Sequence, residues 1–141
     1  MFGSRKRREG VDALYAEARR LADNVGIDPG LLPQADAENR EDGLWIEAIG
    51  DGSFERFYME RGQRIPLGRG DAAETLFEAL LSASATEAGR REVTQRIPGQ
   101  DTRRQWMEIQ RVLMAAMKPE WEPCVVAHQT EILARAPFRD S

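Results

Sequence analysis

The chain has only one cysteine, Cys124, and one histidine, His128, among 141 residues. A single cysteine forms no internal disulfide and builds no zinc site by itself. No apolar run approaches the roughly 20 residues that a membrane-spanning helix needs. The basic run at residues 5–8 is not followed by the apolar stretch of a secretory signal. We therefore expect a cytoplasmic protein with no membrane partner.

Lysine and arginine are not in excess, since the formal net charge is −4. A nucleic-acid-binding domain usually carries an excess of basic residues, so we expect no nucleic-acid partner. The 41% hydrophobic and 31% charged fractions are typical of a soluble globular protein. The length predicts a single domain, residues 1–141, with residues 1–10 as a basic, flexible tail.

Apolar residues recur at helical spacing in four segments. The predicted helices cover about residues 12–24, 71–88, 102–117 and 119–134. Asp71 is expected to cap the second helix, with Glu74 three residues on, and Gly89 is expected to end it.

Two strands are predicted between the first and second helices, over residues 44–49 and 54–60, joined by a glycine-rich hairpin turn. Residues 64–67 can add only a short third strand, which belongs at an edge because Pro66 has no N–H to donate. Residues 31–42 are expected to be an exposed acidic loop. No βαβ alternation is present, so the pattern predicts an α+β fold: a small antiparallel sheet, made of the hairpin and a short edge strand, packed with about four helices.

Few residues are candidates for chemistry. His128 falls on the apolar stripe of the last predicted helix and is expected to pack in the core. Cys124 lies one turn away and is expected to be buried, whereas a catalytic Cys–His pair needs an accessible thiolate and a third group that orients the base. The three tryptophans, Trp45, Trp106 and Trp121, are also expected in the core.

The acidic residues do not form a recognisable metal or catalytic pattern. Segment 36–42 lacks the ligand spacing and closing glutamate of a calcium loop. Gly68-Arg69-Gly70-Asp71 lacks the Lys-Ser/Thr of a phosphate loop and is predicted to be a helix start instead. We therefore expect no metal, no cofactor, no small-molecule substrate and no enzymatic activity.

The most informative stretch is residues 96–106, in which three arginines surround one aspartate before a helix. Asp101 is placed to accept backbone N–H groups at that helix start. The planar fork of arginine binds a carboxylate through two parallel hydrogen bonds. One interpretation is an internal network of Arg96, Asp101 and Arg103 that holds the 90–100 loop to the helix. The other is that Arg103 or Arg104 contacts a partner.

Two further motifs accompany this stretch: Glu60-Arg61-Gly62 upstream and Ala136-Pro137-Phe138 downstream. Residues 96–104 form the pattern Arg-x-x-x-Gln-Asp-x-Arg-Arg through Arg96, Gln100, Asp101, Arg103 and Arg104. Together, over roughly residues 44–140, these motifs resemble the immunity protein 63 family of bacterial polymorphic-toxin systems. Members of that family protect the producing cell by binding a toxin encoded beside them.

The resemblance implies a non-catalytic protein that binds and neutralises a cognate toxin by occlusion, a nuclease being one candidate for that toxin. The alternative is a small cytoplasmic regulatory or adaptor protein with a different protein partner. The expected toxin interface joins the acidic loop to the exposed strand edge, because acidic residues speed encounters with basic partners and aromatic residues anchor interfaces. Its candidate residues are Asp36, Glu38, Glu41, Asp42, Tyr58, Arg64 and Arg69.

Overall fold

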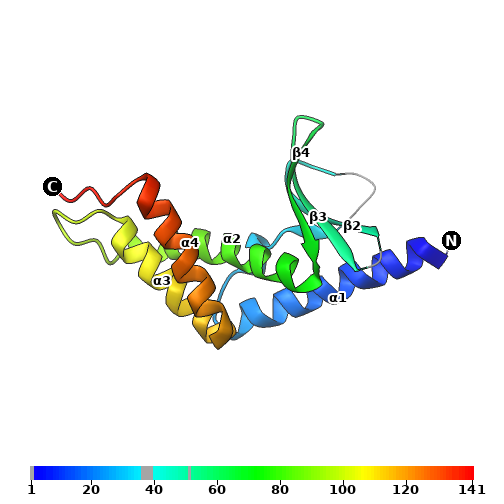
Figure 1. Ribbon diagram of the computed structural model, residues 1–141, viewed down its shortest axis with the longest axis horizontal. Helices are drawn as coiled ribbons and strands as arrows, with labels where there is room; N and C mark the ends of the chain where they lie inside the picture. Colours follow the sequence, from blue (N-terminus) through cyan, green and yellow to red (C-terminus); the bar gives the residue numbers. More distant parts are fainter. Residues whose placement is uncertain (1, 36–39, 51) are drawn as a thin grey trace. The chain divides into compact units, whose positions relative to one another are not determined.

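The computed structural model of the chain describes residues 2–35, 40–50 and 52–141. The described residues form an α+β fold, as the sequence pattern predicts, with four α-helices and a small sheet (Figure 1). The elements in chain order are α1 Phe2–Asn24, the 3-10 turn η1 Pro29–Leu31, β1 Gln34–Ala35, β2 Gly43–Gly50, β3 Ser53–Glu60, β4 Gln63–Asp71, α2 Ala72–Glu92, α3 Arg103–Met117, the 3-10 turn η2 Pro119–Trp121 and α4 Glu122–Arg135.

The contacts divide the chain into two compact units. Unit 1 contains the residues up to 21 together with residues 32–79, and it holds the sheet. Unit 2 contains residues 22–31 and 80–141, and it holds α3, α4 and the second part of α2. Each unit has its own buried side chains.

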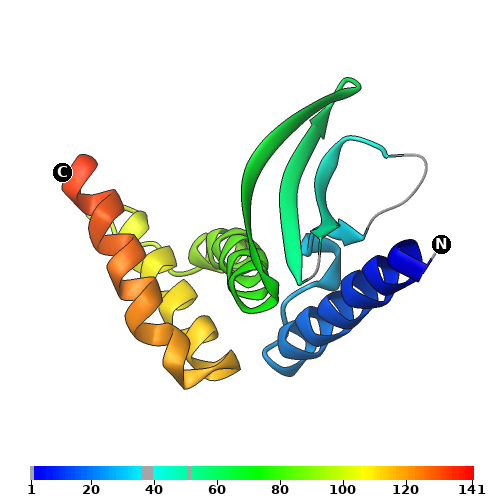
Figure 2. The same ribbon diagram turned by 45° about the vertical axis from the view of Figure 1, so that its right-hand side comes forward.

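The sheet has the strand order β1-β2-β3-β4 (Figure 2). β2, β3 and β4 pair antiparallel, which confirms the predicted hairpin and third strand. β4 lies at the edge, as Pro66 requires, but it is nine residues long and not four, and a β-bulge at Leu67 interrupts its register. The two-residue β1, parallel to β2, lies in the segment that was predicted to be a loop.

Because the sheet is pleated, successive side chains along each strand point to opposite faces of the sheet. The helix face carries Phe54, whose ring lies 3.6 Å from the position of a Cβ at Gly10 of α1. The opposite face, which we call the arginine face, carries two buried aromatic residues, Trp45 and Phe57. Helix α1 therefore packs against the Phe54 part of one face, and long arginine side chains cover Phe57 on the other.

Helix α1 begins ten residues before the predicted start at Asp12. Residues 2–10, predicted to be a flexible tail, are helical, and the basic run 5–8 lies in the first turns. The helix runs through Gly10, against which Phe54 packs. Its predicted apolar stripe is confirmed, since Val11, Leu14, Ala18 and Leu21 are buried.

The start of α2 follows the predicted chemistry. Asp71 Oδ1 accepts the backbone N–H of Glu74 at 2.8 Å, which confirms the cap. Gly70 is required there, because a Cβ would lie 2.9 Å from the Cβ of Glu74. The predicted stop at Gly89 is wrong: α2 continues to Glu92, and Arg91 in its last turn donates to the carbonyls of Val25 and Gly26.

The core of unit 2 includes an amide network between α3 and α4. Gln129 donates to Gln110 Oε1 at 2.9 Å and to the Met107 carbonyl at 2.8 Å. Gln110 in turn donates to the carbonyl of Leu81 at 3.0 Å. Gln129 thereby takes the core position predicted for His128, which is exposed. Cys124 is also exposed, so both of those predictions were wrong.

The tryptophan predictions are partly confirmed. Trp45 and Trp121 are buried. Trp106 is only half-buried, whereas the buried residues of α3 are Met107, Gln110, Leu113, Met114 and Met117.

Candidate functional site

The Glu60-Arg61-Gly62 motif forms the tight turn between β3 and β4. Arg61 and Gly62 have φ angles of 50° and 79°, and Glu60 pairs with Gln63 across the turn. Two residues with positive φ match the twist of the flanking strands, and glycine adopts this conformation without strain. The N–H of Arg61 donates to Asp42 Oδ1 at 2.9 Å, so Asp42, a candidate toxin contact, also holds this turn.

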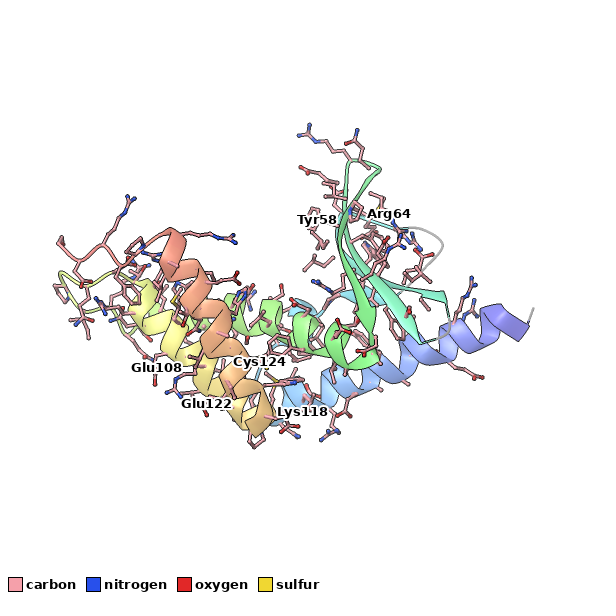
Figure 3. The ribbon with its side chains drawn as sticks, in the orientation of Figure 1. Tyr58, Arg64, Glu108, Lys118, Glu122 and Cys124 are labelled. Carbon is pink, nitrogen blue, oxygen red and sulfur yellow. The ribbon has the colours of Figure 1, made fainter. Side chains whose placement is uncertain are left out.

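The other interface candidates lie in different surroundings. Asp36 and Glu38 lie outside the described residues. Glu41 is exposed, and its carbonyl accepts the indole N–H of Trp45 at 2.8 Å. Tyr58 and Arg64 point away from opposite sides of the hairpin (Figure 3).

Tyr58 belongs to an apolar patch of which the sequence predicted only Tyr58 itself as a contact residue. Its side chain is 37% exposed, and Ile65, its direct partner across β3 and β4, is 41% exposed. Leu67, at the bulge, is also exposed. We call these three residues the hairpin patch. The turn at Arg61-Gly62 was a usable signal for it, because a two-residue loop places Tyr58 opposite Ile65.

Arg64 and Arg69 belong to an ion-pair cluster on the arginine face. Arg64 binds Glu55 and, at 2.6 Å, Glu47, while Arg69 Nε donates to Glu55 at 2.7 Å. These hydrogen bonds from Arg64 and Arg69 lower the pKa of the nearly buried Glu55 carboxyl, although burial acts in the opposite direction. Arg64 also stacks on the Phe57 ring at 3.7 Å. Arg64 is therefore committed to internal contacts, whereas most of the Arg69 side chain is exposed.

Asp101 and Arg103 bind the C-terminal segment to the start of α3. Arg103 Nη2 donates to Asp101 Oδ2 at 2.8 Å, and the same guanidinium donates to the carbonyls of Ala136 and Pro137 at 2.6 and 2.7 Å. Asp101 accepts the N–H groups of Arg103 and Arg139 at 3.0 and 2.8 Å. Two side chains thus satisfy two carbonyls and two N–H groups.

Arg104 and Gly99 complete this arrangement. Arg104 binds Asp140 through two nitrogens and lies 4.0 Å from the centre of the Phe138 ring. Asp140 accepts the N–H of Asp101, and Ser141 donates its N–H to the Gly99 carbonyl at 2.8 Å. We call the contacts between residues 99–104 and 136–141 the C-terminal clasp. The two motifs, far apart in sequence, meet in it.

Arg96 and Gln100 have other partners. Arg96 pairs with Glu92 one turn earlier on the chain, at 3.0 Å, and not with Asp101. Gln100 accepts a hydrogen bond from Gln105 at 2.8 Å. Asp101 and Arg103 pair as predicted, but they hold the C-terminal segment to the start of α3, and Arg96 is not part of this network.

The clasp is expected to make the free energy of unfolding fall as the solution becomes acidic. Hydrogen bonds, chiefly from the Arg103 side chain and the Arg139 N–H, hold the pKa of Asp101 well below its ordinary value of roughly 3.9. A carboxyl with a lowered folded pKa contributes stability above its unfolded pKa, and that contribution is lost as the pH falls below about 4. The free energy of unfolding is expected to fall less in Asp101→Asn than in the wild type when the pH is lowered from about 7 to about 3. Urea unfolding at both pH values measures the change. Equal pH dependence in both proteins would contradict this.

Cys124, labelled in Figure 3, lies on α4 one turn before His128. Its sulfur contacts the carbonyl of Glu120 at 3.9 Å. Within the described part of the chain, no group of three or more His, Cys, Asp or Glu side chains is arranged to hold a metal ion. Over the same residues, no helix is long and apolar enough to cross a membrane.

Comparison with known proteins gives one match. The sequence model of the family described as immunity protein 63 matches residues 51–131, more than half of the chain. This range includes the Glu-Arg-Gly turn and the motif at 96–104 but ends before Pro137-Phe138. No curated protein and no solved structure matches the chain. The match over β3, β4, α2, α3 and most of α4 shows that the chain belongs to the immunity protein 63 family.

Proposed function

We propose that this immunity protein binds a cognate toxin directly in the cytoplasm and neutralises it by occlusion, without catalysis of its own. The family match carries the proposal, because it establishes an immunity-protein role in general. Neutralisation by occlusion needs a stable protein–protein interface and no catalytic group. We treat residues 1–141 as one immunity domain in this proposal.

The hairpin patch is the proposed centre of the toxin interface. Tyr58, Ile65 and Leu67 expose apolar side chains on neighbouring strands inside the matched range. Tyrosine is enriched among the residues that dominate binding energy, and such residues cluster near the centre of an interface.

Polar residues toward both ends of the hairpin are proposed to form the rim of this interface. Arg69 exposes most of its side chain, and Glu41 and Asp42 are exposed between β1 and β2. Asp36 and Glu38 remain candidates from the sequence. A polar rim around an apolar centre is the usual anatomy of a protein–protein interface. Arg64 is proposed to support the interface by holding β4 through Glu47 and Glu55.

The test is co-expression with the toxin candidate encoded beside the gene for this chain. The wild-type protein is expected to restore cell survival and to copurify with the toxin. Tyr58→Asp combined with Ile65→Asp is expected to weaken the complex by about a hundredfold or more, because charge replaces the apolar centre of the interface. Affinity is measured by biolayer interferometry with purified proteins.

Val126→Asp is the matched control, because Val126 on α4 is 43% exposed, close to the 41% of Ile65. It is expected to bind as the wild type does. A harmless neighbour that does not copurify would contradict direct neutralisation and favour the adaptor function. Toxin binding that survives the double substitution would move the interface away from the hairpin patch.

A further inference from the structure

The loop between α2 and α3 exposes two aliphatic side chains in unit 2. Residues 93–100 are all exposed, and among them Ile97 is 51% exposed and Val93 is more exposed still. The backbone of this loop is nevertheless anchored, because the Gly99 carbonyl accepts the Ser141 N–H at 2.8 Å. Gly99 itself has φ 84°, and a Cβ there would lie 3.1 Å from the Ser141 oxygen. The C-terminal clasp thus anchors, through Gly99, a loop that exposes two aliphatic side chains.

Among the charged side chains beside this loop, two arginines are more exposed than the carboxylates next to them. In the Arg96–Glu92 pair, the Arg96 side chain is 59% exposed and the Glu92 side chain is 7% exposed. Arg139, held next to the loop by its N–H bond to Asp101, is exposed, while the Asp101 carboxylate is mostly covered. Arg96 and Arg139 therefore expose positive charge beside the loop, while the nearby Arg104–Asp140 pair exposes both signs about equally.

We propose that Val93, Arg96, Ile97 and Arg139, here called the loop surface, form a second docking surface for the toxin. It would take a toxin segment that carries acidic side chains next to an apolar one. This inference rests on the proposed function and adds the chemistry of a second contact. An ordered loop loses little conformational freedom on binding, which favours affinity.

The composition of the loop surface favours a protein segment over a nucleic acid. Single-stranded nucleic acids are bound by stacking bases on aromatic side chains, and residues 93–100 contain none. Val93 and Ile97 instead offer aliphatic contacts of the kind that pack against apolar protein side chains. The adjacent arginines can bind carboxylates through paired hydrogen bonds.

The test measures toxin affinity of the full-length chain after Ile97→Glu and, separately, Arg139→Glu. Each variant is expected to bind at least about tenfold more weakly. Added salt is expected to weaken wild-type binding more than Arg139→Glu binding, because the variant has lost an attractive charge. Val112→Glu is the control, since Val112 lies on α3 in the same unit and is also 51% exposed. It is expected to bind as the wild type does.

The outcomes separate this inference from the proposed function. Wild-type affinity in both loop variants, with binding lost in the hairpin-patch variant, overturns the loop surface and leaves the proposed function intact. Equal weakening by Val112→Glu also overturns it, because the effect is then not local. Failure of the wild-type chain to bind the toxin overturns both proposals. Circular dichroism melting confirms that the exposed substitutions leave the fold unchanged.

Discussion

Replacing Phe57 with alanine is expected to lower the free energy of unfolding by about 3–5 kcal/mol, as truncation of a buried aromatic residue does. Phe57 is fully buried although it lies on the face of the sheet opposite Phe54. Its ring is covered by the guanidinium groups of Arg40 and Arg64, at 4.8 and 3.7 Å. The variant loses both the buried ring area and these cation–π contacts. Urea unfolding followed by circular dichroism measures the change.

Tyr58 is the natural comparison, because it is the next residue and points to the other face. Tyr58→Ala is expected to change the free energy of unfolding by about 1 kcal/mol or less, since the side chain is partly exposed. The same variant should weaken toxin binding. Equal loss of stability in both variants would show that the arginine face does not form a real core around Phe57.

Replacing Arg103 with alanine is expected to lower the melting temperature by several degrees and to loosen the C-terminal segment. The substitution removes the side-chain donors to Asp101 and to the Ala136 and Pro137 carbonyls together. It also leaves the Asp101 carboxylate without its main cationic partner. Hydrogen exchange should become faster at the amides of Arg139 and Ser141, which are bonded inside the clasp.

Arg135→Ala is the control for this experiment. Arg135 is highly exposed and approaches Glu131 only at 3.8 Å, so its loss should have little effect on stability. Unchanged melting and exchange in Arg103→Ala, accompanied by weaker toxin binding, would instead support the alternative in which Arg103 contacts the toxin. Loss of stability is the expected outcome, because the Arg103 side chain bonds to Asp101 and to the Ala136 and Pro137 carbonyls in the clasp.

The parts of the fold that depend on local chemistry could be predicted from the sequence. The hairpin of β2 and β3 follows from its turn residues, and the start of α2 follows from Asp71. The edge position of β4 follows from the missing N–H of Pro66. In each case the controlling residue lies within a few positions of the element that it controls.

The errors arose where contacts between distant elements decide the outcome. Gly89 does not end α2, because a helical glycine costs only about 1 kcal/mol and the continued helix brings Arg91 to the carbonyls of Val25 and Gly26. His128 is exposed because the neighbouring Gln129 can bond to Gln110 in the core, a partner that periodicity does not reveal.

The candidate sites were predicted to different extents. The pairing of Asp101 with Arg103 follows from their chemistry and spacing. Their link to Ala136 and Pro137 required the path of the chain in space. The hairpin patch was predicted only in part. Residues 64–67 were predicted as a short strand, and the exposure of Ile65 and Leu67 beside Tyr58 depends on the full length and register of β4.

The interruption in β4 has a consequence for behaviour at high concentration. A long, exposed edge strand normally invites the edge of another molecule, which leads to aggregation. Here the bulge at Leu67 and the missing N–H of Pro66 break the row of hydrogen-bonding groups in the middle of the strand. We therefore expect the interruption to oppose edge-to-edge pairing of two molecules through β4, even though apolar side chains on this strand are exposed.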